Sequence, residues 1–177
     1  RPIAVAGLLG GRTGAALAAD RVAEECAMHA ARLSAAGCEI IVACSVGPFA
    51  SKLGRMSAII SASTLRLPTW ALVELRAGRT SDGEDLAECA KSAVDSGAQV
   101  LLFDARSEVD AAEAIEAVVG VLGEAKVGVV LADHAADVDA WAESAKRLVA
   151  GGAHVLGGGP GTTTLHMAAL ARSLHGP

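Results

Sequence analysis

Aromatic residues are almost absent from this sequence. It has two phenylalanines, two tryptophans and no tyrosine, and 52% of its residues are hydrophobic, most of them alanine, valine and leucine. Small aliphatic side chains of this kind are typical of buried parallel strands that are covered by helices. A length of 177 residues favours one domain, so residues 1–177 are treated as a single unit.

Long apolar runs are also lacking. No run approaches the roughly 18 residues that a membrane-spanning helix needs, so no membrane partner is expected. The opening RPIAVAGLLGGRTG has no small-residue cleavage pattern of a signal peptide, and it indicates a strand followed by a glycine loop.

Excess positive charge and paired cysteines are missing as well. A net charge of −5 argues against a nucleic-acid partner, because phosphate binding needs clustered lysine and arginine. The four cysteines (Cys26, Cys38, Cys44 and Cys89) form no CxxC pair and no His/Cys zinc motif. Free thiols predict a reducing, cytoplasmic compartment.

What the sequence does contain is an alternation of short apolar runs and longer amphipathic segments. The runs predict strands at 3–8, 39–44, 70–75, 99–103, 127–131 and 154–156. The amphipathic segments predict helices at about 20–36, 49–62 and 163–174, one within 81–97, one with a face of Ala112, Ile115, Val118, Val119 and Leu122, and one with a stripe of Trp141, Ala145, Leu148 and Val149. We expect Ser81 or Asp82 to cap the third helix and Ser107 the fourth.

Each unit takes roughly 30 residues, and strands that alternate with helices predict right-handed βαβ units and a parallel sheet. Six such units fall short of the eight of a TIM-type barrel, which typically needs about 250 residues. The pattern alone leaves two α/β architectures open, an open doubly wound sheet and an incomplete barrel.

In both architectures ligands bind at the carboxyl ends of the strands. The residues expected at this rim are 7–12, 44–47, 74–76, 104–106, 133–134 and 157–164. The last stretch, GGGPGTTT, opens a helix without the spacing of a P-loop or of GxGxxG. It could hold a carboxylate or phosphate on backbone N–H groups. The alternative, which we favour, is a tight turn capped by Thr162 or Thr163.

Three other rim stretches carry reactive side chains. Asp133 and His134 are adjacent after a strand and Asp104 ends another, which would suit a base and its orienting partner. A solvated loop is the more frequent outcome for neighbouring residues. Cys44 at a strand end could be a nucleophile, although a buried structural thiol is the better interpretation. His166, one turn into the last helix, could face the glycine turn.

The C-terminal segment AKRLVAGGAHVLGGGPGTTTLHMAALARSL resembles the end of homocysteine S-methyltransferases, where a strand runs into GGCCGTTPEHI-like sequence. Upstream, LSAAGCEIIVACS, LPTWALVE, DGEDLAE, VLLFDARSE and VGVVLADHA are similar, in order, to later strands and loops of that family. The resemblance implies a partial TIM-type (β/α) barrel of about six units that lacks the family's N-terminal strands and their "DGamGT" segment.

The resemblance also implies a zinc ion held by three cysteines, which would bind homocysteine as a thiolate. The corresponding positions here are Ala105, Gly159 and Pro160, so no metal ligand set and no cofactor are predicted. The family's Glu that holds the amino group aligns with Cys44, and a Ser of the next strand aligns with Leu72.

These departures favour a family protein of the pseudoenzyme type, without zinc-dependent methyl transfer but still connected with methionine metabolism. One alternative is an active S-methyltransferase with a non-standard site; others are a non-enzymatic subunit or interaction domain and a different TIM-type enzyme that binds an anion at 157–163. An amino-acid-like small molecule is a possible ligand, and an oligomer or a longer parent chain is expected. The candidate ligand-binding residues are Cys44, Asp104, Asp133, His134, Gly158, Gly159, Gly161 and Thr162.

Overall fold

The computed structural model describes residues 4–9, 19–44, 52–132 and 137–175. Strands and helices alternate along the chain, as the period of the apolar residues predicts. In order they are β1 Ala6–Leu9, α1 Ala19–Ala35, β2 Ile40–Cys44, α2 Lys52–Ser63, β3 Thr69–Arg76, β4 Arg79–Thr80, α3 Leu86–Asp95, β5 Val100–Ala105, α4 Glu108–Val118, β6 Lys126–Leu131, α5 Val138–Ala150, β7 Val155–Gly158 and α6 Thr164–His175.

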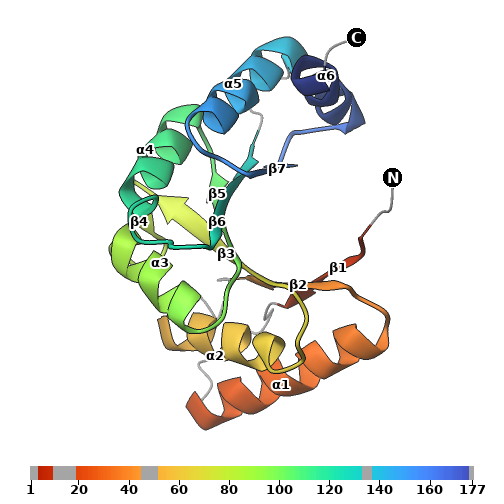
Figure 1. Cartoon of the computed structure of the whole chain (residues 1–177), viewed down its shortest axis with the longest axis vertical. Helices are drawn as coiled ribbons and strands as arrows, with labels where there is room; N and C mark the ends of the chain where they lie inside the picture. The colour runs from red at the N-terminus through yellow and green to blue at the C-terminus, as the bar shows by residue number, and fades with distance from the viewer. Residues whose placement is uncertain (1–3, 10–18, 45–51, 133–136, 176–177) are drawn as a thin grey trace.

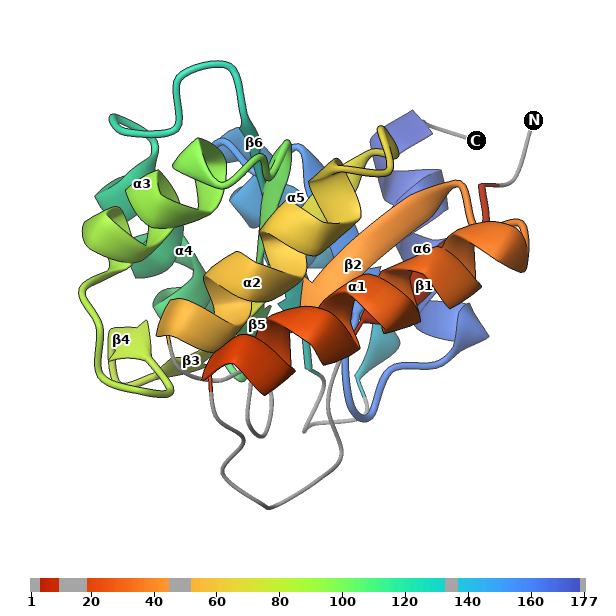
Figure 2. The ribbon, with the colours of Figure 1, turned by 90° about the horizontal axis from the view of Figure 1, so that it is seen from below.

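The long strands form one parallel sheet in the order β1-β2-β3-β5-β6-β7. The helices lie along the outside of the curved sheet, and the ring of strands is open between β7 and β1 (Figure 1). Figure 2 shows α1 and α2 side by side on this outer face. A doubly wound sheet would have helices on both faces. Of the two architectures that the sequence left open, the structure is therefore the partial TIM-type barrel.

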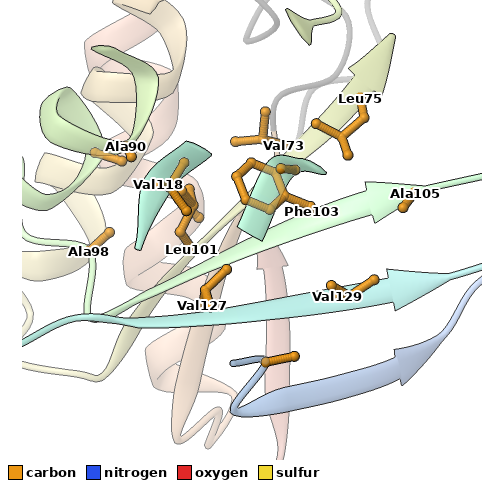
Figure 3. Packing of buried hydrophobic residues seen from close by; sticks show 14 of the residues in the cluster. Val73, Leu75, Ala90, Ala98, Leu101, Phe103, Ala105, Val118, Val127 and Val129 are labelled. Carbon is orange, nitrogen blue, oxygen red and sulfur yellow. The ribbon is translucent and has the colours of Figure 1, made fainter. Parts of the chain in front are cut away.

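The two faces of the sheet are packed differently. Odd-numbered residues of the central strands, such as Leu101, Phe103, Val127 and Val129, are buried against the helices (Figure 3). The inner face carries a smaller cluster of Val42, Cys44, Val100 and Leu102, with partly buried Ile40, Trp70, Leu72 and Val155 around it. Because side chains alternate along a strand, β2, β3 and β5 contribute residues to both clusters.

The predicted helix starts are confirmed in part. Ser107 caps α4 by accepting a hydrogen bond from the Asp110 N–H, as expected. The cap of α3 is Asp85, whose side chain accepts from the N–H groups of Ala87 and Glu88, so the prediction of Ser81 or Asp82 is wrong. The error has a local cause, because residues 79–80 form β4, a short antiparallel extension of β3 that the sequence analysis did not predict.

Two predicted helix faces also need correction. In α4 the buried residues are Ala111, Ala114, Ile115 and Val118, whereas Ala112 is exposed. Val119, which follows α4, is 60% exposed, and Val149 on α5 is 37% exposed. The predicted stripe in α5 is otherwise correct, since Trp141, Ala145 and Leu148 are buried. None of the helices in the described ranges is both long enough and apolar enough to cross a bilayer.

Candidate functional site

Glu74 and Asp104 lie side by side where β3 and β5 end. The two residues are register partners in the parallel ladder, and both belong to the inner face of the sheet. Together with Arg106, Ala132 and Pro160 they line a cavity of about 250 Å³ at the carboxyl rim. The cavity therefore brings together the ends of three strands and Pro160 of the glycine turn.

The charges in this cavity are mixed. Arg106 lies 3.5 Å and Arg76 3.9 Å from a carboxylate oxygen of Glu74. Burial raises the pKa of Asp104, and the nearby Glu74 carboxylate raises it further, while Arg106 lowers it. The carboxylates lie deeper than the two arginine side chains, which are 68% and 69% exposed. The inner part of the cavity is thus acidic and its outer part is basic.

Cys44 lies on the inner face of the sheet, in the row of register partners two residues before these carboxylates. It pairs in register with Leu72, which in turn pairs with Leu102, two residues before Asp104. Only 3% of Cys44 is exposed, and burial, followed by the charge of Asp104, raises the pKa of its thiol to about 12. The structure therefore supports the interpretation of a buried thiol and not that of a nucleophile.

The glycine turn between β7 and α6 is closed by its own hydrogen bonds. The Gly159 N–H donates to the Leu131 carbonyl (2.9 Å), and the Thr162 hydroxyl donates to the Gly159 carbonyl (2.7 Å). Gly161 has a φ of +88°, which favours glycine there. A Cβ on Gly158 would lie 2.2 Å from the Thr162 hydroxyl oxygen. These contacts make the segment a tight strand-to-helix turn, the alternative that the sequence favoured.

The cap of α6 is Thr163, and His166 completes it. The Thr163 hydroxyl accepts from the Leu165 N–H (3.3 Å), and Nδ1 of His166 accepts from the Thr163 N–H (3.1 Å). The imidazole is 3% exposed and meets the Trp141 ring edge-on at 5.5 Å between centroids. His166 therefore ties the glycine turn to α5 and does not point into the rim cavity, which it does not line.

Of the remaining candidates, Asp133 and His134 lie outside the described residues. Glu74 and Arg106 were noted only as rim positions in the sequence, yet they line the cavity. For Glu74 the signal in the sequence was the spacing of two residues in Trp70, Leu72 and Glu74, which places these side chains on the same face of the strand. Within the described part of the chain, no three His, Cys, Asp or Glu side chains come together as a metal site.

Comparison with known proteins decides the family. The model of the homocysteine S-methyltransferase family matches residues 4–174. The chain belongs to the homocysteine S-methyltransferase family. A comparison with curated protein sequences gives no significant match.

Solved structures of this family share the fold. The metallated homocysteine methyltransferase MmuM from Escherichia coli is 16% identical and superposes with a TM-score of 0.72 over 88% of this chain and 52% of that one. The apo form of the same enzyme gives 14% identity, a TM-score of 0.60, and coverage of 94% and 78%. A pyruvate carboxylase structure from Rhizobium etli matches 98% of this chain and 18% of its own length, with 13% identity and a TM-score of 0.65. The chain thus spans about half the length of the metallated homocysteine methyltransferase.

The three residues to which the sequence resemblance assigns the family's zinc-binding cysteines, Ala105, Gly159 and Pro160, do not suit a metal site. Ala105 is fully buried in the cluster that faces the helices (Figure 3). Gly159 is packed so closely that a Cβ would lie 3.1 Å from the Ala132 nitrogen and 3.2 Å from its Cα. Pro160 lines the rim cavity but has no ligand atom in its side chain. None of these three residues offers a side-chain atom that could bind a metal ion.

Proposed function

We propose that this member of the homocysteine S-methyltransferase family does not carry out zinc-dependent methyl transfer, and that its carboxyl rim binds an amino-acid-like small molecule. The observation that carries the proposal is that Ala105, Gly159 and Pro160, the residues to which the sequence resemblance assigns the zinc-binding cysteines, have no side-chain ligand atom, and that Gly159 is in close contact with the Ala132 backbone. A cysteine at 159 would need the backbone after β6 to move before its sulfur could reach a metal ion.

The mixed charges of the rim support the ligand part of the proposal. The carboxylates of Glu74 and Asp104 suit an ammonium group, and the more exposed guanidinium of Arg106 suits a carboxylate. A zwitterion has both groups and no net charge, so it matches a cavity that contains both signs. Without zinc, a thiol at this rim would stay mostly protonated at neutral pH and would be a poor methyl acceptor.

Two measurements on the purified chain test the proposal. Elemental analysis after incubation with zinc and desalting should find far less than one zinc per chain, and titration calorimetry with L-homocysteine should detect weak binding that does not change when a chelator is added. As a control, Asp104→Asn should weaken this binding. Stoichiometric zinc, or homocysteine methylation that needs zinc, would show that the protein is an active enzyme with a non-standard site.

A second candidate function is that of a subunit, and the inner face of the sheet favours it. Leu8 of β1 is 58% exposed and Trp70 and Leu72 are only partly buried, although they stand on an apolar face. Parallel sheets are ordinarily covered on both faces. Light scattering coupled to size exclusion tests this candidate, because a subunit should elute as an assembly and not at the mass of a single chain.

A further inference from the structure

Arg55 is the bulkiest of the fully buried side chains in the described ranges, with 1% exposure. It belongs to α2 and shares the buried stripe of Ala58, Ile59 and Ala62, which faces the sheet. Its guanidinium forms an ion pair with Glu84, and its second terminal nitrogen lies 3.9 Å from Asp82. A charged side chain therefore occupies a core position between α2 and the 80–85 loop, which precedes α3.

The 80–85 loop is closed around the buried Thr80. The Glu84 N–H donates to the Thr80 hydroxyl (2.8 Å), and the Thr80 N–H donates to the Glu84 carbonyl (3.2 Å). The Thr80 hydroxyl also lies 2.5 Å from an Asp82 carboxylate oxygen. Lys52, at the start of α2, adds a second cation 3.0 Å from the Glu84 carboxylate. The loop thus fixes the Asp82 carboxylate and the backbone of Glu84, and Lys52 helps to hold the Glu84 carboxylate.

This loop is joined directly to the rim cavity. The Ser81 N–H donates to the backbone carbonyl of Glu74 (3.0 Å), and Thr80 pairs with Leu75 in the β3–β4 ladder. Glu74 is also the residue of β3 that lines the cavity. A continuous set of contacts therefore leads from Arg55 through Glu84 and the loop to the last residues of β3.

Stability alone does not account for this arrangement. Desolvation of a buried ion pair offsets most of its attraction, and apolar residues of similar volume are often as stable or more so. What the charged pair adds is one preferred loop conformation, because the ion pair between Arg55 and Glu84 forms only when the loop holds Glu84 within reach of α2. We propose that Arg55 is a positioning residue, whose pair with Glu84 fixes the 80–85 loop and thereby holds Glu74 in the rim cavity. The link to ligand binding rests on the function proposed above.

The first test replaces the pair by apolar side chains, in the variant Arg55→Met/Glu84→Met. Hydrogen exchange followed by NMR should show the Ser81 and Glu84 amides exchanging about tenfold faster or more, while amides of β5 and β6 and the urea midpoint stay at the wild-type values. The single variant Arg55→Lys keeps the positive charge opposite Glu84, so its Ser81 and Glu84 amides should be better protected from exchange than those of the double variant. Unchanged protection at Ser81 and Glu84 would overturn the proposal, and so would a lower midpoint with uniformly faster exchange, since that would indicate a structural role only.

The second test measures homocysteine binding by calorimetry for the wild type, the double variant and Arg147→Met. Arg147 pairs with Glu108 between α4 and α5, and neither residue lines the rim cavity, so its variant removes an ion pair outside that cavity. The double variant should lose about fivefold or more in affinity through lost preorganisation, and Arg147→Met should bind like the wild type. Equal affinity of all three proteins contradicts positioning. A wild type that does not bind homocysteine contradicts the proposed function, and the exchange data then decide positioning alone.

Discussion

Asp104 is an acidic group that the fold holds partly out of water and beside a second carboxylate. Burial and Glu74 raise its pKa above the ordinary value of 3.8. The folded protein therefore binds this proton more tightly than the unfolded chain, so the free energy of unfolding falls as pH rises from about 3.8 through the folded-state pKa, and stays lower above it. Above that window the charged Asp104 destabilises the protein.

Asp104→Asn should consequently stabilise the protein at neutral pH, because the charged form of Asp104 is no longer held out of water. Urea unfolding at neutral pH and at about pH 3 measures the effect, which should vanish at the lower pH because Asp104 is protonated in both states there. A destabilising effect at neutral pH would show that the carboxylate makes favourable contacts that outweigh its desolvation.

Thiol reactivity provides a second prediction about single residues. Burial raises the pKa of Cys26 and Cys89 to about 11 and that of Cys44 to about 12. At about pH 8 a thiol of pKa about 12 is ionised in roughly one molecule in ten thousand. Ellman's reagent should therefore label the half-buried Cys38 first, and Cys38→Ser should remove the fast phase. Rapid labelling of Cys44 in the folded protein would contradict its burial.

The sequence pointed to some of these residues and missed others for a physical reason. Asp104 and Cys44 could be placed at the rim because they follow apolar strands. Arg55 was not singled out, although its spacing from Ala58, Ile59 and Ala62 marks the buried face of a helix. Its partner Glu84 is 29 residues away, and no local pattern fixes a pairing over that distance.

The N-terminus of α6 illustrates how one element depends on a reciprocal cap. The Thr163 hydroxyl accepts a hydrogen bond from a backbone N–H of the first turn, and His166 Nδ1 accepts one from the Thr163 N–H. This is the arrangement of a capping box, with an imidazole in the place of the usual carboxylate or amide. Thr163→Ala should lower the free energy of unfolding by about 1 kcal/mol, whereas Thr163→Ser should leave it almost unchanged. Urea unfolding of the two variants provides the comparison, and equal stability would show that the hydroxyl does not act as a cap.

Strand β6 has a glycine, Gly128, at a position where the neighbouring strands leave no room for a side chain. A Cβ on Gly128 would lie 2.6 Å from a Leu102 methyl and 2.8 Å from the Val155 backbone oxygen. Gly128→Ala should therefore destabilise the protein by about 1–3 kcal/mol through overpacking. Gly120→Ala is a suitable control, because no heavy atom lies within 4 Å of the added Cβ there. Thermal unfolding that shows equal losses for both variants would contradict the packing explanation.

Most elements could be predicted from periodicity, but the start of α3 could not be placed. The segment TSDGED contains several side chains able to cap a helix, and the choice depends on the turn at Ala77 and Gly78, with φ of 49° and 73°. That turn lets β4 fold back on β3 and delays the helix to Asp85. The Asp85–Glu88 spacing was the local signal for the correct start.

At the scale of the whole molecule, all helices of the described ranges lie on one face of the sheet (Figure 1). The repeat of βα units predicted the parallel sheet, whereas strand order and curvature became predictable only through the family resemblance, because periodicity does not say on which side a helix packs. In the structure the parallel strands follow one another in the order of the sequence, β1-β2-β3-β5-β6-β7, and right-handed connections between strands in this order place the helices on the same side of the sheet.

The exposed inner face leads to a prediction about association. Leu8→Glu replaces a side chain that is 58% exposed, so the free energy of unfolding of a single chain should change by no more than about 0.5 kcal/mol. If the inner face is covered by a partner, the same variant should shift the assembly toward single chains in light scattering. A large loss of stability without any change in mass would show that Leu8 is packed within its own chain.

The close approach of Gly159 to Ala132 couples the glycine turn to the shape of the rim cavity. Any side chain added at 159 would press on the backbone of Ala132, which itself lines the cavity, so a substitution there would change the space at the rim without touching its charges. Space and charge at this rim are therefore set by different residues: the turn limits the space, and the carboxylates and guanidinium groups near the ends of β3 and β5 set the charge.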